Sequence, residues 1–286
     1  MDTQIQTLID KTGSLASLPD IFFKVNELVN DASSSASDIG LAIEQDAALS
    51  ARLLKIVNSP YYGFPSSIDT ISRAITIIGT RDLRDLILAT TAVETFSGID
   101  NDMIDMERYW RHNLYCAVTG RILAQRRHVK NTERLFVAGL LHDIGKLVMY
   151  QTIPEQCNEA LQRTHTQGTP LYITEKEIIG FSHADVGAAL MHSWKLPDSL
   201  IEAVKYHHEP WLAKDYREDV ATVHIADYIA SSIDEDSNHS GMITPVNEGA
   251  WETTGLSLET LDTALCEVTD KFLEMQTLLF PATRAA

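Results

Sequence analysis

The chain has 286 residues, of which 44% are hydrophobic, and it carries a formal net charge of −17 at pH 7. This length allows a large buried core, in one domain or in two lobes that share an interface. The acidic excess argues against nucleic acid and anionic membranes as partners, because the average surface repels phosphate groups. The sequence lacks an apolar run near the roughly 20 residues of a membrane span. Its three cysteines are too widely spaced for a disulfide framework, so we expect a cytoplasmic protein with reduced thiols.

Apolar residues recur at spacings of three and four almost from the start of the chain, as in residues 21–29 and 49–57. This spacing predicts helices with one buried face. Gly, Pro, Ser and Asn replace the periodicity at 59–67 and 237–255, where we expect loops. Because alternating strand patterns are hard to find, the sequence predicts an all-α protein.

The chain divides into four predicted regions. Residues 1–13 form a first helix, 14–100 a first helical half, 101–236 a second helical half, and 237–286 a loop followed by a helix that packs on the domain. In and beside the loop at 59–67, Asn58, Tyr61 and Tyr62 could line a groove for a ligand or partner. Aromatic residues next to a proline in a loop more often anchor packing.

Histidine and aspartate form an ordered series of the kind that a metal site needs. A lone histidine is more often an ordinary core or surface residue, and an adjacent His-Asp pair is a weak signal by itself. Imidazoles with carboxylates, in the absence of thiolate pairs, suit divalent transition metals such as Fe, Mn, Ni or Zn. The series is His112, His142, Asp143, His183, His207, His208 and Asp227, all but one in segments with helical spacing.

The centre of the series is the segment 133–150, which the spacing predicts as one helix. His142 and Asp143 interrupt its apolar surface, and a buried carboxylate needs a metal, a cation or hydrogen-bond donors. Adjacent helical positions point about 100° apart, so the two side chains cannot address one ion in the same way. We expect Asp143, with two oxygens, to bridge two metals while His142 binds one.

Lys146 follows His142 by one helical turn, which places an ammonium group beside the metals, where a phosphate oxygen could lie. Asp143 and Lys146 are therefore the candidate catalytic residues. Gly145, and Gly187 one turn after His183, are expected to leave open space beside the site.

The chain resembles the HDOD branch of the HD superfamily of metal-dependent phosphohydrolases. The resemblance rests on LASLPDIFFKVNELVND, DIGLAIEQDAALSARLLKIVNSPYYGF, GLLHDIGKLVMY and HADVGAALMHSWKLPDSLIEAVKYHHEP. It implies an HD-type multi-helical bundle, formed by the second half, with an additional N-terminal helical lobe. It also implies a bacterial regulatory role in signal transduction.

Many HDOD proteins have lost the metal ligands, whereas here the matching positions are filled. The filled series looks like that of HD-GYP cyclic dinucleotide phosphodiesterases, yet the GYP element is missing, since His208 is followed by EPWLAKDYRED. Arg108 stands where some trinuclear relatives place a glutamate, so two ions are expected. The corresponding hypothesis gives one ion to His112, His142 and Asp227, the other to His183 with His207 or His208, and Asp143 to both.

Two functions remain open at this point. The first is a regulatory HDOD protein with a binuclear metal site, which binds a small phosphorylated ligand, a nucleotide or a signalling protein without turnover. The second is an active metal-dependent phosphohydrolase or phosphodiesterase acting on a nucleotide or cyclic dinucleotide. A third interpretation, in which buried histidines serve structure alone, would leave thermal stability unchanged by chelation.

Overall fold

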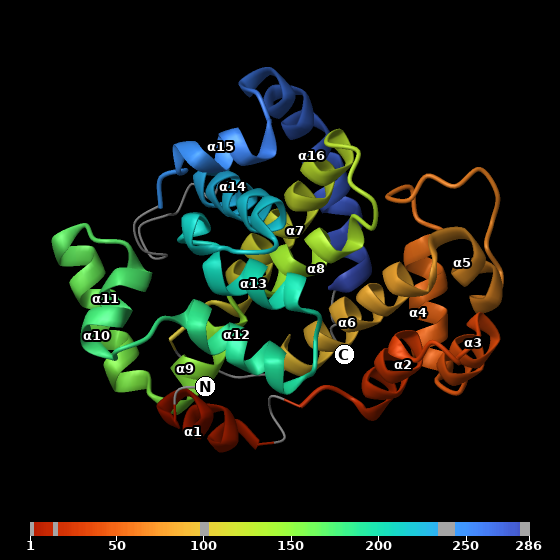
Figure 1. The fold of residues 1–286 in the computed structure, drawn as a ribbon, viewed down its shortest axis with the longest axis horizontal. Helices are drawn as coiled ribbons and strands as arrows, with labels where there is room; N and C mark the ends of the chain where they lie inside the picture. Colours follow the sequence, from red (N-terminus) through yellow and green to blue (C-terminus); the bar gives the residue numbers. More distant parts are fainter. Residues whose placement is uncertain (1–2, 14–16, 98–102, 234–243, 281–286) are drawn as a thin grey trace, which may run out of the picture.

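The computed structural model describes residues 3–13, 17–97, 103–233 and 244–280 (Figure 1). Helices and loops make up these ranges, without a strand among them, so the predicted all-α class is confirmed. The predicted region boundaries at 14, 100 and 236 lie outside the described residues. Among the helices that are described, none is both long and apolar enough to cross a membrane.

The first half of the chain forms a helical layer at one side of the molecule (Figure 1). Short polar residues begin several of its helices; Ser35 and Asp38 form a reciprocal capping box, and Asp46 accepts a hydrogen bond from the backbone N–H of Leu49 at 2.9 Å. The helices are α2 (Asp20–Asn30), α3 (Ala36–Glu44), α4 (Ala47–Val57), α5 (Ile71–Ile78) and α6 (Thr80–Ser97).

The second half of the chain is built around one long helix, α7 (Met106–Arg126). The helices that follow it are α8 (Glu133–Leu141), α9 (Ile144–Thr152), α10 (Pro154–Gln167), α11 (Leu171–Ile178), α12 (His183–Ser193), α13 (Asp198–Tyr206), the 3₁₀ turn Pro210–Leu212, α14 (Arg217–Ile233), α15 (Glu248–Thr254) and α16 (Leu258–Leu279). Helix α7 contacts α8, α14 and α16. The first helix of the chain, α1 (Thr3–Thr12), lies against α9 and α12.

One continuous hydrophobic core joins the two halves. Helix α16 runs along α7 and also reaches α4 of the first half. The loop after α4 is pinned from inside: the Asn58 side chain donates to the carbonyl of Ile68 at 2.6 Å and accepts from the Ile68 N–H at 2.7 Å. Tyr61 in this loop is 4% exposed, which supports a packing role for it.

The predicted helix over 133–150 is wrong in one respect, because the structure breaks it at its centre. Helix α8 ends at Leu141 and α9 begins at Ile144, so His142 and Asp143 occupy the turn between them. The Asp143 backbone has φ −97° and ψ 6°, and its side chain makes no capping bond to α9. In this turn, one carboxylate oxygen of Asp143 lies beside His183 of α12 and the other beside Lys146 of α9.

Candidate metal centre

All seven predicted ligands lie together in the second half of the molecule. Five separate elements supply them, so the cluster exists only in the folded chain. His112 comes from α7, His142 and Asp143 from the turn between α8 and α9, His183 from the first position of α12, His207 and His208 from the segment directly after α13, and Asp227 from α14.

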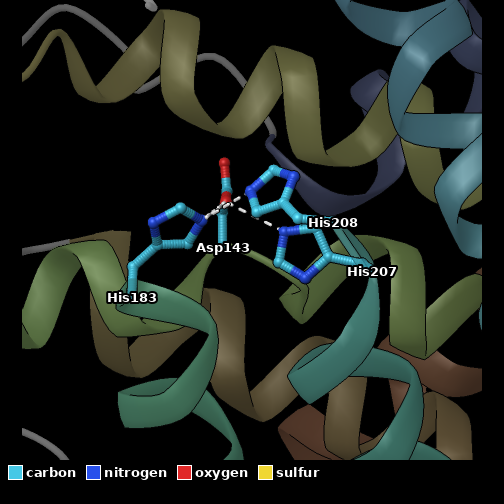
Figure 2. Close-up of side chains that lie close together, drawn as sticks. All are labelled: Asp143, His183, His207 and His208. Carbon is cyan, nitrogen blue, oxygen red and sulfur yellow. Dashed lines mark hydrogen bonds and ion pairs between the residues drawn. The ribbon is translucent and has the colours of Figure 1, made fainter. Parts of the chain in front are cut away.

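The first cluster, here the Asp143 group, consists of Asp143, His183, His207 and His208, whose ligand atoms lie within 4.8 Å of one another. Figure 2 shows the three imidazoles converging on the carboxylate. Nε2 of His183 lies 3.2 Å from Oδ1 of Asp143 and 3.0 Å from Nε2 of His208. The four side chains are thus arranged around a common point.

The second cluster, here the His112 group, consists of His112, His142 and Asp227, again within 4.8 Å. Nε2 of His112 lies 3.3 Å from Nε2 of His142 and 3.2 Å from Oδ1 of Asp227. Nε2 of His142 lies 3.6 Å from the same oxygen. Two imidazoles and one carboxylate therefore face each other, as three ligands of one ion would.

Asp143 connects the two groups: one of its oxygens faces the histidines of its own group, and the other faces the His112 group. Oδ1 is nearest to His183, at 3.2 Å, with Nε2 of His207 at 3.9 Å. Oδ2 lies 3.5 Å from Nε2 of His142 and 4.0 Å from Nε2 of His112. This is the placement that a bridging carboxylate needs.

Lys146 of α9 lies beside the carboxylate of Asp143. Its Nζ donates to Oδ2 of Asp143 at 2.6 Å, and its side chain is 17% exposed. The side chain of His112 is exposed to the same extent, 17%.

The histidines are oriented by their second ring nitrogens. Nδ1 of His142 lies 2.7 Å from the carbonyl of Gly139, and Nδ1 of His207 lies 2.6 Å from the carbonyl of Val204. Because a carbonyl only accepts, Nδ1 donates in both rings, and Nε2 is the nitrogen that faces the cluster. Nε2 is therefore the atom that each of these two rings would offer to a metal.

Sequence reasoning missed two residues of the surroundings. Glu175 of α11 accepts from the backbone N–H of His183 at 2.9 Å, and Nδ1 of His183 lies 2.6 Å from the same oxygen. The Tyr172 ring stacks on His208 with 4.6 Å between centroids. A signal for Glu175 was available: it sits one turn after Leu171 on the apolar face of its helix, where a lone carboxylate needs a partner.

Charges within the cluster reinforce one another. Burial would raise the pKa of Asp143, but Lys146, His142 and His183 hold it well below its usual range. Burial would likewise raise the pKa of Asp227, but its bonds to His112 and His142 lower it. Both carboxylates are therefore ionised at neutral pH.

The buried imidazoles divide into two kinds. Burial, together with the neighbouring charge of His142, lowers the pKa of His207 to about 3. Burial, and then the proximity of His207, lower the pKa of His208 well below its ordinary value. Burial also opposes the charged form of His142, but Asp143 raises its pKa well above the ordinary value. Likewise Glu175 outweighs burial and raises the pKa of His183. The carboxylates of Asp143 and Glu175 thus favour the protonated form of the ring beside each of them.

The residues fit a divalent transition metal. Three buried atoms of the Asp143 group lack a hydrogen bond: Oδ1 of Asp143, Nε2 of His207 and Nδ1 of His208. Such atoms normally cost about 1–3 kcal/mol each when left without a partner. Imidazole nitrogens with carboxylate oxygens are the donor set of Fe, Mn, Ni and Zn sites, so an ion would use atoms that the protein itself leaves unpaired.

Two glycines bring the contributing helices close enough. A Cβ on Gly139 of α8 would lie 2.7 Å from Cα of Ala117 in α7, and one on Gly145 of α9 would lie 2.0 Å from the carbonyl oxygen of His183 in α12. The predicted open space beside Gly145 and Gly187 is therefore wrong. The facing helix fills it, since Gly187 in turn approaches Gly145 and Val204.

Comparison with known proteins agrees with the fold. An HDOD domain protein of unknown function from Geobacter sulfurreducens has a TM-score of 0.75 at 22% identity, over 99% of this chain and 98% of that one. A candidate phosphohydrolase from Shewanella amazonensis SB2B has a TM-score of 0.72 at 24% identity, covering 95% and 97%. A candidate signal transduction protein from Marinobacter aquaeolei VT8 has a TM-score of 0.68 at 19% identity, covering 92% and 59%.

A curated relative, an uncharacterized protein of Treponema pallidum (strain Nichols), is 24% identical over 230 residues. The match covers 80% of this chain but 44% of that protein, so the chain spans less than half of its length. The HDOD domain family matches residues 15–210, which takes in both halves of the fold and the ligands up to His208. The chain belongs to the HDOD domain family.

Proposed function

We propose that this chain is a regulatory HDOD protein whose second half binds two divalent transition-metal ions in a centre of the HD phosphohydrolase type. One observation carries the proposal: the two oxygens of Asp143 face two separate groups of ligands. The His112 group would hold one ion, His183 with His207 or His208 the other, and Asp143 both.

The regulatory part of the proposal is supported by the family and by the first half of the chain. Within the described residues of that half, no cluster of metal-ligating side chains occurs. One similar structure is described as a candidate signal transduction protein. A small phosphorylated ligand or nucleotide at the metal centre, and a signalling protein on the first half, are the proposed partners.

Elemental analysis of protein purified without added metal tests the proposal. We expect about two ions per chain, the number in two-metal sites, and a fall in melting temperature when a chelator removes them, because a ligand that binds only the folded state stabilises it. Metal-free protein with a melting temperature indifferent to chelator and to added metal would leave the histidines a structural role only.

Hydrolysis of a phosphoester is the second candidate function, favoured by the place of Lys146. Two bound ions would supply an activated water and polarise a phosphoryl oxygen. Lys146, which is partly exposed beside Asp143, would donate to the phosphoryl oxygen on which negative charge develops. Asp143 and Lys146 thus remain the proposed catalytic residues, with a nucleotide or cyclic dinucleotide as the proposed substrate.

The test is hydrolysis of cyclic dinucleotides and of bis(p-nitrophenyl) phosphate by metal-loaded protein. Lys146→Met is expected to lower kcat by roughly 10²–10³, the usual loss for one donor to a developing oxyanion, with the ion content preserved. Lys205→Met, on the exposed face of α13, is the matched control. Turnover that survives Asp143→Ala would exclude this centre as its source.

A further inference from the structure

The two ends of a helix offer different partners to a histidine, and the candidate centre uses both ends. His142 and His207 follow α8 and α13 directly. The last carbonyls of a helix lack intrahelical partners, and Nδ1 of each ring meets the carbonyl three residues earlier, of Gly139 and of Val204. At these positions the helix orients its own histidine.

His183 stands at the opposite kind of helix end. It is the first residue of α12, where the free backbone groups are N–H donors and no acceptor faces the ring. Its Nδ1–H therefore needs an acceptor from another element. Its backbone N–H needs one too, because Asp185 of the capping box is bonded to Ser182.

A single oxygen meets both needs. Oε2 of Glu175 in α11 accepts from the His183 backbone N–H at 2.9 Å and lies 2.6 Å from Nδ1 of the same residue. Glu175 is 1% exposed and His183 1% exposed, so water does not compete for either bond. A negative charge at this place is also favoured by the N-terminal end of the α12 dipole.

We propose that Glu175 is a positioning residue of the metal centre, which turns Nε2 of His183 toward the Asp143 group and strengthens that group as a ligand set. The inference rests on the proposed binuclear centre. A carboxylate behind an imidazole fixes its tautomer and makes the ring a stronger donor, and its loss typically weakens metal binding by about 10–100-fold.

The effect is confined to one of the two ions. In the His112 group, His142 depends on the carbonyl of Gly139 and not on a carboxylate behind the ring. Loss of the Glu175 charge therefore weakens the binding of the ion held by the Asp143 group and leaves the binding of the other ion unchanged. A general loosening of the fold would weaken the binding of both ions.

The experiment is a calorimetric titration of chelator-treated protein with Mn²⁺. Glu175→Gln keeps the shape of the side chain and removes its charge, and we expect one of two binding events to weaken by about 10–100-fold while the other stays as in the wild type. Glu177→Gln makes the same change in charge on the exposed side of α11, where Glu177 pairs with Arg163 at 2.5 Å; both events should persist.

Each other outcome has a definite meaning. Two unchanged events in Glu175→Gln, or two events weakened equally, would overturn the positioning role and leave the binuclear centre standing. A wild type that binds no Mn²⁺ would overturn the centre and this inference together. If Glu175→Gln does not fold, Glu175→Asp retains the charge but withdraws it by one methylene group, and the same selective weakening is required of it.

Discussion

Asp143 is the residue that both ligand groups of the candidate centre share. Its two oxygens face different groups, at 3.2 Å from His183 and 3.5 Å from His142. Asp143→Asn would keep one neutral acceptor and replace the other by a donor, which repels an ion. We expect this variant to lose both ions, whereas His112→Asn should lose one. Elemental analysis of the two variants decides, and an Asp143→Asn protein that retains two ions would contradict the bridging role.

Protonation of the centre makes a second prediction. Asp143 raises the pKa of His142, and Glu175 raises that of His183, against burial in both cases. Both shifts favour the protonated rings in the metal-free protein, and an ion, which needs the neutral imidazole, must displace those protons. Affinity should then rise with pH, by about tenfold per pH unit for each displaced proton.

Calorimetry in two buffers with different ionisation enthalpies measures the protons released on binding Mn²⁺. We expect release at neutral pH, ending once the pH exceeds the raised pKa values. His207, with its pKa near 3, is neutral throughout and contributes nothing. Binding without release, and with affinity flat between about pH 6 and pH 8, would contradict the raised values.

The seven candidate ligands could be proposed from the sequence because they form an ordered series, and because three of them also break the local pattern. His142, Asp143 and Asp227 interrupt apolar helical faces, and the ordered series distinguishes them from isolated histidines. Glu175 escaped because its partner, His183, lies on another helix. Nothing in the spacing of α11 and α12 shows that the end of one meets the start of the other.

At the scale of the helices, the close approach of the α9 and α12 backbones brings Asp143 and His183 together. Gly145 leaves α9 near enough to α12 that an added Cβ would lie 2.0 Å from a backbone oxygen. The sequence predicted a site with open space at this glycine, because periodicity shows which face a residue occupies but not how near the facing backbone lies. The break between α8 and α9 was missed for a similar reason, since apolar spacing continues through it.

Gly145→Ala tests the close approach. The methyl group can be accommodated only if α9 and α12 separate, so we expect a loss of about 1–3 kcal/mol or more in the free energy of unfolding, together with weaker metal binding. Gly187→Ala is the matched control, because its Cβ would meet a side-chain methyl of Val204 at 3.0 Å, which can move. Urea unfolding of both variants gives the comparison, and equal stabilities would contradict the argument.

At the scale of the whole molecule, a buried ion pair of the second half meets two aromatic rings of the first half at the junction between them. Nε of Arg121 in α7 donates to Glu133 in α8 at 2.6 Å. The guanidinium carbon lies 4.3 Å from the ring centroid of Tyr61 and 4.9 Å from that of Tyr62, in the loop of the first half. The loop at 59–67 thus fastens the first half to the helix that carries His112.

Because the hydrophobic core is continuous across this junction, we expect the described halves to unfold in one transition. Arg121→Met would leave Glu133, 2% exposed, as a buried charge without its cation, which typically costs about 3–5 kcal/mol. Arg126→Met in the same helix breaks a pair with Glu267 that is 39% exposed on both sides, and should cost less than about 1 kcal/mol.

Urea unfolding followed by far-UV circular dichroism and by tryptophan fluorescence tests both points. We expect the two signals to change together in the wild type and in both variants, with a clearly lower midpoint for Arg121→Met. Separate transitions would show that the two halves are stabilised independently. The contact of Arg121 with the loop would then not couple the first half to the metal centre.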